Sequence, residues 1–198
     1  MRLIADNLAC ERNGREVFQG LSFSIPAGDY LELRGANGSG KSSLLRIVAG
    51  LLPVAGGSLT LEGSDAGVPL NQCCHYSGHQ DAVKSALTVR ENMDFWATMY
   101  GGAAIEMALA EFSLEGLADH PAQILSAGQR RRLALTRLLL APRPIWLLDE
   151  PATALDVTHQ EKLVALAVSH LARGGMVVAA THGDWGLKPA RQLLLGEA

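Results

Sequence analysis

The sequence predicts an α/β fold with a mostly parallel sheet and a helical lobe inserted between two of its strands. Strand patterns alternate with helical patterns at both ends of the chain, and a mostly helical stretch runs from Thr88 to about Leu140 between them. Strands that alternate with helices are typical of a sheet covered by helices. The length of 198 residues fits one domain with a modest insertion. We therefore expect a core at about 1–87 and 143–198 and a helical lobe at about 88–142.

The first half of the chain contains the predicted N-terminal strands and one helix. Alternating apolar residues predict the strands, and the turn Pro26-Ala27-Gly28-Asp29 joins the second to the third. A glycine-rich loop then leads into an apolar helix, which ends near Gly50 and Pro53. The predicted strands of this half are residues 2–8, 17–25, 29–34, 58–62 and 72–77.

The second half begins with the helical stretch, which is broken at Gly101-Gly102, Gly116 and Pro121. Residues 145–148 (IWLL) are apolar throughout, as expected of a strand in a buried parallel sheet. A helix is predicted after this strand, and two more strands follow it. These three elements are expected at about 158–172, 176–181 and 192–195.

The composition indicates a folded globular protein, because 48% of the residues are hydrophobic and 19% are charged. The net charge of −3 argues against a nucleic-acid partner and against a polybasic lipid anchor. No apolar run approaches the ~20 residues of a membrane span, and the N-terminus lacks the apolar core of a signal peptide. We therefore expect contact with a membrane only through a partner protein.

The three cysteines, Cys10, Cys73 and Cys74, show neither a CxxC spacing nor a zinc-binding pattern. Unpatterned cysteines fit a reducing compartment, where they behave as small buried hydrophobes. Cys73 and Cys74 are adjacent in a predicted strand, so we expect them to face opposite sides of the sheet. A redox role for this pair is the alternative.

Residues 35–42, GANGSGKS, match the pattern G-x-x-x-x-G-K-[ST] between a strand and a helix. Glycines let the backbone curl so that successive N–H groups point at phosphate oxygens, and the helix N-terminus adds partial positive charge. Lys41 reaches the β- and γ-phosphates, and the Ser42 hydroxyl is a ligand for Mg²⁺. A plain glycine-rich turn would leave the Lys-Ser pair unexplained. The predicted phosphate-binding residues are Gly35, Ala36, Asn37, Gly38, Ser39, Gly40, Lys41, Ser42 and Ser43.

The segment IWLLDE (145–150) places two carboxylates at the end of a buried strand. Ligands of α/β sheets bind at the carboxyl ends of the strands, so Asp149 is expected to hold Mg²⁺ there. Glu150 follows it and is the candidate general base that orients and deprotonates the attacking water. A turn or helix cap is the structural alternative for this Asp-Glu pair.

The segment LSAGQRRR (125–132) combines a serine, a glycine and three arginines. Taken alone, Ser126 is typical of a helix N-cap. Arg130, Arg131 and Arg132 are then most simply a solvated helix face. Read with the phosphate loop, the same arginines would add positive potential near a phosphate.

The phosphate loop, the LSAGQ segment and the strand ending in Asp-Glu form an ordered set that resembles the ATP-binding subunits of ABC transporters. The usual motif there is LSGGQ, and Ala127 replaces its first glycine. The resemblance implies that Ser126, Gly128 and Gln129 contact the γ-phosphate of ATP held by a second subunit. It therefore implies a homodimer of ATP-binding subunits. It also implies the α/β fold of a P-loop NTPase of the ABC type, with a mixed sheet core and an inserted helical lobe.

Two further segments match the same family. ALD (154–156) resembles the loop that touches the partner subunit, with Asp156 as its main residue. THGD (181–184) follows an apolar strand, and its His182 resembles the switch histidine that contacts the γ-phosphate. A structural or solvent-exposed histidine is the simpler alternative. The resemblance thus implies Lys41, Glu150 and His182 as the catalytic group.

Two positions depart from the family pattern. A glutamine is expected about eight residues before the LTVREN segment, and the chain has His79 there, followed by Gln80. Either residue is a candidate for the contact with Mg²⁺ or water, although Mg²⁺ prefers oxygen ligands to imidazole. The aromatic residue that stacks on adenine is replaced by Arg12, whose guanidinium can also stack on a base. Phe18 is a less favoured substitute.

Within the family, residues 74–97 and 125–156 are similar to the ATPase subunit of the cytochrome c-type biogenesis complex, the heme exporter. This implies integral-membrane partner subunits, ATP and Mg²⁺ as cofactors, and a peripheral place on the cytoplasmic face of the inner membrane. The chain has no C-x-x-C-H signature, so we expect no direct heme binding, and a heme-ligand role for His75 and His79 is disfavoured. The rival hypotheses are a soluble, non-transport ABC ATPase and a nucleotide-sensing module with weak hydrolysis.

Overall fold

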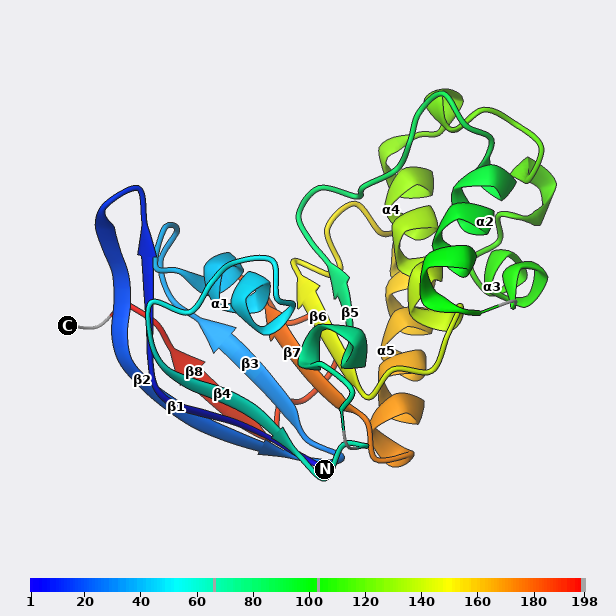
Figure 1. Ribbon diagram of the computed structural model, residues 1–198. Helices are drawn as coiled ribbons and strands as arrows, with labels where there is room; N and C mark the ends of the chain where they lie inside the picture. Colours follow the sequence, from blue (N-terminus) through cyan, green and yellow to red (C-terminus); the bar gives the residue numbers. More distant parts are fainter. Residues whose placement is uncertain (66, 103, 197–198) are drawn as a thin grey trace. The chain divides into compact units, whose positions relative to one another are not determined.

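The computed structural model describes residues 1–65, 67–102 and 104–196, and these form two compact units (Figure 1). The first, which we call the core unit, comprises Met1–Tyr76, Arg143–Pro151 and Ala167–Ala198. The second, the helical unit, comprises Ser77–Pro142 and Ala152–Leu166. The final helix of the chain, α5, begins in the helical unit and ends in the core unit.

The secondary structure follows the predicted order. The strands are β1 (Arg2–Arg12), β2 (Arg15–Pro26), β3 (Tyr30–Arg34), β4 (Gly56–Glu62), β5 (Cys74–Ser77), β6 (Ile145–Asp149), β7 (Met176–Ala180) and β8 (Arg191–Leu194). The α-helices are α1 (Lys41–Val48), α2 (Val89–Tyr100), α3 (Ile105–Glu111), α4 (Ala127–Thr136) and α5 (Val157–Ala172). Short 3₁₀ helices lie at Leu70–Cys73, Glu115–Leu117, Ala122–Ile124 and Arg137–Leu139.

The strands form two sheets. In the five-stranded sheet, of order β5-β6-β7-β3-β8, the pairs β6/β7, β7/β3 and β3/β8 are parallel, as predicted. The first, second and fourth strands form a separate antiparallel sheet of order β2-β1-β4. The sequence did not predict this separate sheet.

A two-residue turn explains the antiparallel pairing of β1 with β2. Asn13 and Gly14 both have positive φ, 53° and 74°, and Arg12 pairs with Arg15 across them. An Asn-Gly pair with positive φ at both residues is the preferred two-residue hairpin turn. Parallel strands need a longer crossover, and α5 supplies one between β6 and β7.

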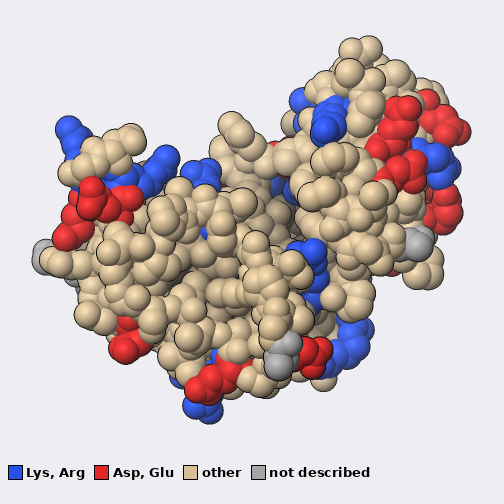
Figure 2. Space-filling model, in the orientation of Figure 1, with Lys and Arg blue, Asp and Glu red and all other residues tan. Residues whose placement is uncertain are grey.

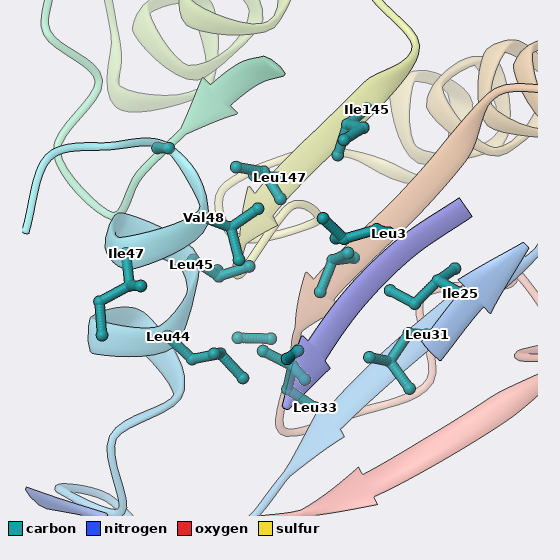
Figure 3. Packing of buried hydrophobic residues seen from close by; sticks show 14 of the residues in the cluster. Leu3, Ile25, Leu31, Leu33, Leu44, Leu45, Ile47, Val48, Ile145 and Leu147 are labelled. Carbon is teal, nitrogen blue, oxygen red and sulfur yellow. The ribbon is translucent and has the colours of Figure 1, made fainter. Parts of the chain in front are cut away.

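The main hydrophobic core of the core unit joins both sheets to α1 (Figure 3). Four apolar side chains of α1 are at most 3% exposed, and those of Leu44, Leu45 and Val48 point toward the strands. Burying each such side chain stabilises the fold by about 1.5–3 kcal/mol. The packing fixes α1 against β6 and β7, so it also fixes the loop before α1. The labelled residues of this cluster are Leu3, Ile25, Leu31, Leu33, Leu44, Leu45, Ile47, Val48, Ile145 and Leu147.

In the helical unit, capping boxes begin two of the helices. Thr88 Oγ1 accepts the Glu91 N–H at 3.1 Å, and the Glu91 carboxylate accepts the Thr88 N–H at 2.7 Å. This reciprocal pair satisfies two N–H groups at the start of α2. Asn92, which is 2% exposed, then fixes the preceding segment by bonds to the backbone N–H and C=O of Lys84 at 2.8 and 3.0 Å.

Two predictions about the cysteines have different outcomes. All three thiols are free and buried, as predicted, and burial raises the pKa of Cys74 to about 12. The placement of Cys73 in a strand is wrong, because Cys73 ends a 3₁₀ helix and β5 begins at Cys74. Pro69 caps this 3₁₀ helix, and the Gln72 N–H donates to the Pro69 carbonyl oxygen at 2.9 Å, a bond within a 3₁₀ turn and not within a sheet.

The described part of the chain contains no helix that is both long enough and apolar enough to cross a membrane. On the face shown in Figure 2, Lys and Arg lie scattered among acidic and uncharged residues, and Asp and Glu gather along one side of the helical unit.

Candidate functional site

The phosphate loop wraps around the Lys41 side chain. Lys41 Nζ donates to the carbonyl oxygens of Gly35 at 2.7 Å and Ala36 at 2.9 Å, and the residue is only 7% exposed. Gly40 is the N-cap of α1 with φ 100°, and no side chain caps the helix there. The first N–H groups of α1 therefore have no side-chain acceptor, which is the usual state of an anion-binding helix start.

Two glycines of the loop have no room for a side chain. A Cβ at Gly35 would lie 2.3 Å from the carbonyl oxygen of Leu195 and 2.6 Å from Ser39 Oγ. A Cβ at Gly40 would lie 2.8 Å from Val17 Cγ1, on the neighbouring strand β2. The loop therefore depends on glycine for space as well as for positive φ. Sequence reasoning did not identify Val17, and no sequence signal marks it.

Two carboxylates and a histidine lie at the carboxyl ends of β6 and β7. Asp149 is the last residue of β6 and is 4% exposed. Glu150 follows with φ 49°, and its N–H donates to Ala180 O on β7 at 2.9 Å. Glu150 Oε1 lies 3.7 Å from His182 Nε2. The structure thus brings the predicted general base and the predicted switch histidine together.

A partly buried polar cluster holds the loop that carries the histidine, and sequence reasoning missed it. Arg34 donates from Nη1 to the His182 carbonyl oxygen at 3.5 Å, and its Nε lies 2.9 Å from Glu32 Oε2. Glu32, 2% exposed, also accepts from Gln192 at 2.7 Å. Glu32 and Arg34 are two residues apart in β3, so their side chains lie on the same face of the strand. This i, i+2 pair of opposite charges is the sequence signal that was available.

The LSAGQ segment begins α4 with a second capping box. Ser126 Oγ accepts the Gln129 N–H at 3.2 Å, and Gln129 Oε1 accepts the Ser126 N–H at 2.8 Å. The predicted N-cap role of Ser126 is confirmed. A Cβ at Gly128 would lie 2.9 Å from the Ala154 carbonyl oxygen, so the 154–156 segment packs directly on α4.

The three arginines do not form one solvated face. Arg131 is 4% exposed and donates to the Gly78 carbonyl oxygen at 3.0 Å and to Asp81 Oδ1 at 3.1 Å. Arg132 donates to the Phe112 carbonyl oxygen at 2.7 Å. The prediction of a charged surface is therefore wrong for Arg131, because its partners lie about fifty residues away and only the tertiary fold brings them near.

The sequence profile described as "ABC transporter" matches residues 18–153. This chain belongs to the ABC transporter family. A cytochrome c biogenesis ATP-binding export protein (CcmA) of Bradyrhizobium diazoefficiens is 51% identical over 99% of this chain and 98% of its own. The protein of the same name from Nitrobacter winogradskyi is 50% identical over the whole of both chains, and that from Paramagnetospirillum magneticum is 50% identical over 98% of this chain and 93% of its own.

Solved structures show the same ABC fold at low sequence identity. The ATP-binding subunit of an ABC transporter has a TM-score of 0.82 at 23% identity, with 92% of this chain and 80% of that one covered. A Pyrococcus furiosus chain described as an ABC transporter ATP-binding protein has a TM-score of 0.82 at 22% identity, covering 98% of both. The fold is thus that of an ABC-type nucleotide-binding protein.

The positions that depart from the ABC pattern lie at exposed sites. Arg12 ends β1 beside the Asn-Gly turn and is exposed, whereas Phe18 is 9% exposed. His79 and Gln80 are both exposed, between Gly78 and Asp81, which Arg131 holds. Arg131 therefore fixes the ends of the short segment that carries both candidates.

Residues of the core unit fit ATP and Mg²⁺. Ser39 Oγ is buried and has no hydrogen-bond partner among the described residues, and Lys41 has two neighbouring carbonyls to exchange for phosphate oxygens. No cluster of three or more His, Cys, Asp or Glu side chains in the described ranges could hold a metal. Ser42 and Asp149 offer oxygen donors, and Mg²⁺ is usually bound by one or two protein oxygens together with phosphates and water.

Proposed function

We propose that this ABC-type ATPase is the ATP-hydrolysing subunit of an export complex in cytochrome c biogenesis and that it drives the handling or export of heme. The relatives of that name match it at about half identity over nearly the full length. The single observation that carries the catalytic part is the pairing of Glu150 with His182, 3.7 Å apart, beside the buried Asp149.

In this proposal the phosphate loop binds the triphosphate. Lys41 exchanges its bonds to the Gly35 and Ala36 carbonyls for β- and γ-phosphate oxygens. The uncapped N–H groups at the start of α1 add further donors. Arg12 is the candidate that stacks on the base from the β1–β2 hairpin.

Magnesium would be held by Ser42 Oγ and the Asp149 carboxylate, both oxygen ligands of the kind that Mg²⁺ prefers. When bound, the ion neutralises charge on the β- and γ-phosphates. Asp149 is the last residue of β6, and its pairing with Ala180 of β7 fixes its backbone for this role.

Hydrolysis would use the two residues at the strand ends. Glu150 orients a water molecule and accepts its proton as general base. The bond from the Glu150 N–H to Ala180 O holds the Glu150 backbone, so it fixes the position from which the carboxylate side chain extends. His182 contacts the γ-phosphate, and Arg34 holds its carbonyl.

The proposal requires a second copy of the chain and membrane subunits. Ser126, Gly128 and Gln129 would contact ATP bound to the partner copy, with the N-terminus of α4 directed at its phosphate. The helical lobe would dock on integral-membrane subunits, which places the chain on the cytoplasmic face of the inner membrane. Heme would be handled by those subunits, without direct contact to this chain and without nucleic acid.

The test uses the Glu150→Gln chain. It should bind ATP and accumulate as an ATP-bound dimer, while turnover falls by about 10² or more. Glu161→Gln, an exposed residue of α5, is the matched control and should hydrolyse ATP like the parent. Equal turnover of the Glu150→Gln and parent chains, measured with the membrane partner present, would refute the assignment of the base.

Purification of the parent chain from membranes, with identification of the proteins attached to it, tests the cellular role. Recovery with cytochrome c biogenesis membrane subunits supports the proposal. Recovery free of membrane proteins would favour a soluble ABC ATPase, and nucleotide binding without turnover would favour a sensing module.

A further inference from the structure

A histidine on α5 bridges two segments of the helical unit. His159 Nδ1 lies 2.7 Å from Asp156 Oδ1, and the His159 backbone N–H donates to the same oxygen at 2.9 Å. The other ring nitrogen, Nε2, lies 3.0 Å from Arg132 Nη1 on α4. The side chain of His159 is only 12% exposed, whereas that of Asp156 is 66% exposed.

The chemistry of the partners fixes the form of the ring. A guanidinium carries only donors, and an ionised carboxylate carries only acceptors. Arg132 therefore needs a lone pair on Nε2, and Asp156 needs a proton on Nδ1. The bridge exists only for the neutral ring with its proton on Nδ1, because a protonated ring would turn an N–H toward Arg132.

The same two segments also touch through their backbones. Gly128 of α4 approaches the Ala154 carbonyl oxygen so closely that a Cβ would lie 2.9 Å from it, and Ala154 has φ 63°. Arg132 is in turn anchored to the Phe112 and Ser113 carbonyl oxygens at 2.7 and 3.3 Å. The bridge thus has a fixed point at one end and an exposed carboxylate at the other.

We propose that His159 is a positioning residue that ties Asp156 to α4 through Arg132, so that the Asp156 segment and the Ser126-Gly128-Gln129 segment meet a second copy of the chain as one rigid surface. The consequence for dimerisation rests on the proposed function. Both bonds from His159 to Asp156 end on Oδ1. The other carboxylate oxygen of Asp156, Oδ2, is then left to contact the partner chain.

The charged groups that face the ring are Asp156, which immediately precedes α5, and Arg132 on α4. Lys162 lies one turn further along α5 and donates to the Glu111 carbonyl oxygen at 3.0 Å.

The first experiment measures the ring itself in the nucleotide-free chain. Nitrogen and proton spectra of ¹⁵N-histidine-labelled protein, assigned with the His159→Phe variant, should show the His159 proton on Nδ1 at neutral pH. A proton on Nε2 would overturn the inference. This measurement does not depend on dimerisation, so it holds even if the proposed function fails.

The second experiment measures ATP-dependent dimerisation in the Glu150→Gln background by analytical ultracentrifugation. His159→Phe keeps the ring volume and the backbone bond, and should need about five- to tenfold more protein for half-dimerisation, the effect of one ordinary hydrogen bond or slightly more. His120→Phe, an exposed position in the helical unit, should match the parent. Equal dimerisation of the His159→Phe and parent chains would overturn the inference.

A mutant cycle separates positioning from a general structural role. In a cycle with Arg132→Met, the double variant should be no worse than Arg132→Met alone, because both changes cut the same bridge. Additive losses would contradict the proposal.

Discussion

Arg131 is the residue whose replacement tests the architecture of the helical unit most directly. We consider Arg131→Met, which keeps much of the apolar length of the side chain and removes its charge. The guanidinium, 4% exposed, joins α4 to the Gly78 carbonyl and to Asp81, on either side of His79 and Gln80. Its loss would free both ends of that segment.

The cost follows from what remains unpaired. The Gly78 carbonyl loses a buried bond from a charged donor, worth about 1.5–3 kcal/mol. Asp81, whose side chain is 21% exposed, loses a cation but stays partly hydrated, so this pair adds about 1 kcal/mol. We expect a loss of about 3 kcal/mol of unfolding free energy. For a urea slope of about 2 kcal/mol/M, the unfolding midpoint would fall by about 1.5 M.

Urea unfolding followed by circular dichroism measures this loss, and hydrogen exchange localises it to residues 78–88. Arg130→Met is the matched control, because it makes the same change one residue earlier, where Nε has no partner among the described residues. It should shift stability by less than about 0.5 kcal/mol. If Arg131→Met and Arg130→Met have the same midpoint, Arg131 does not hold the segment and the reasoning fails.

Three further predictions concern close packing and pH. Gly128→Ala places a Cβ 2.9 Å from the Ala154 carbonyl oxygen, so it should lower the unfolding free energy by about 1 kcal/mol and weaken ATP-dependent dimerisation. Gly116→Ala adds a Cβ in open space and should change neither quantity. Equal stability and equal dimerisation of the two variants would contradict this prediction. Gly35→Ala places a Cβ 2.3 Å from a backbone oxygen at φ 143°, so ATP affinity in a nucleotide-binding assay should fall at least about tenfold, and unchanged affinity would refute the geometry. Burial lowers the pKa of His170, so the folded chain favours the neutral ring and the unfolded chain takes up the proton first as the pH falls below 6.5. The melting temperature of the parent should therefore drop more between about pH 7.5 and about pH 5 than that of His170→Phe, and parallel curves would exclude this cause.

Local patterns were sufficient to predict most of the secondary structure. The apolar run IWLL predicts β6, which extends to Asp149, and the serine of LSAGQ predicts the N-cap of α4. The separate antiparallel sheet was not predicted, although Asn13-Gly14 is a hairpin signal in the sequence. Sheet membership depends on which strands pair, and strand patterns alone do not specify pairing.

The candidate site was predictable where it consists of contiguous motifs. The phosphate loop and the Asp149-Glu150 pair lie where strand-end geometry requires them. The contacts that hold two other candidate segments were missed because the partners are distant in sequence: Arg34 contacts the carbonyl of His182, and Arg131 contacts that of Gly78, just before His79. His159 is an intermediate case. Its contact with Asp156 follows from a local capping spacing, Asp156-x-x-His159, whereas its contact with Arg132 joins residues that are distant in sequence.

Helix geometry explains why three consecutive arginines cannot act as one charged patch. Successive residues of an α-helix are about 100° apart, so a run of three spans more than half of the circumference. In a helix that is buried on one side, at least one of the three must turn inward. In α4 the residue that turns inward is Arg131. Arg132 donates to the Phe112 carbonyl oxygen and contacts His159. The Nε of Arg130 is buried without a hydrogen-bond partner among the described residues. Asp81 offsets the charge of Arg131 within the helical unit, and the bonds of Arg131 and Arg132 position the segments at either side of α4.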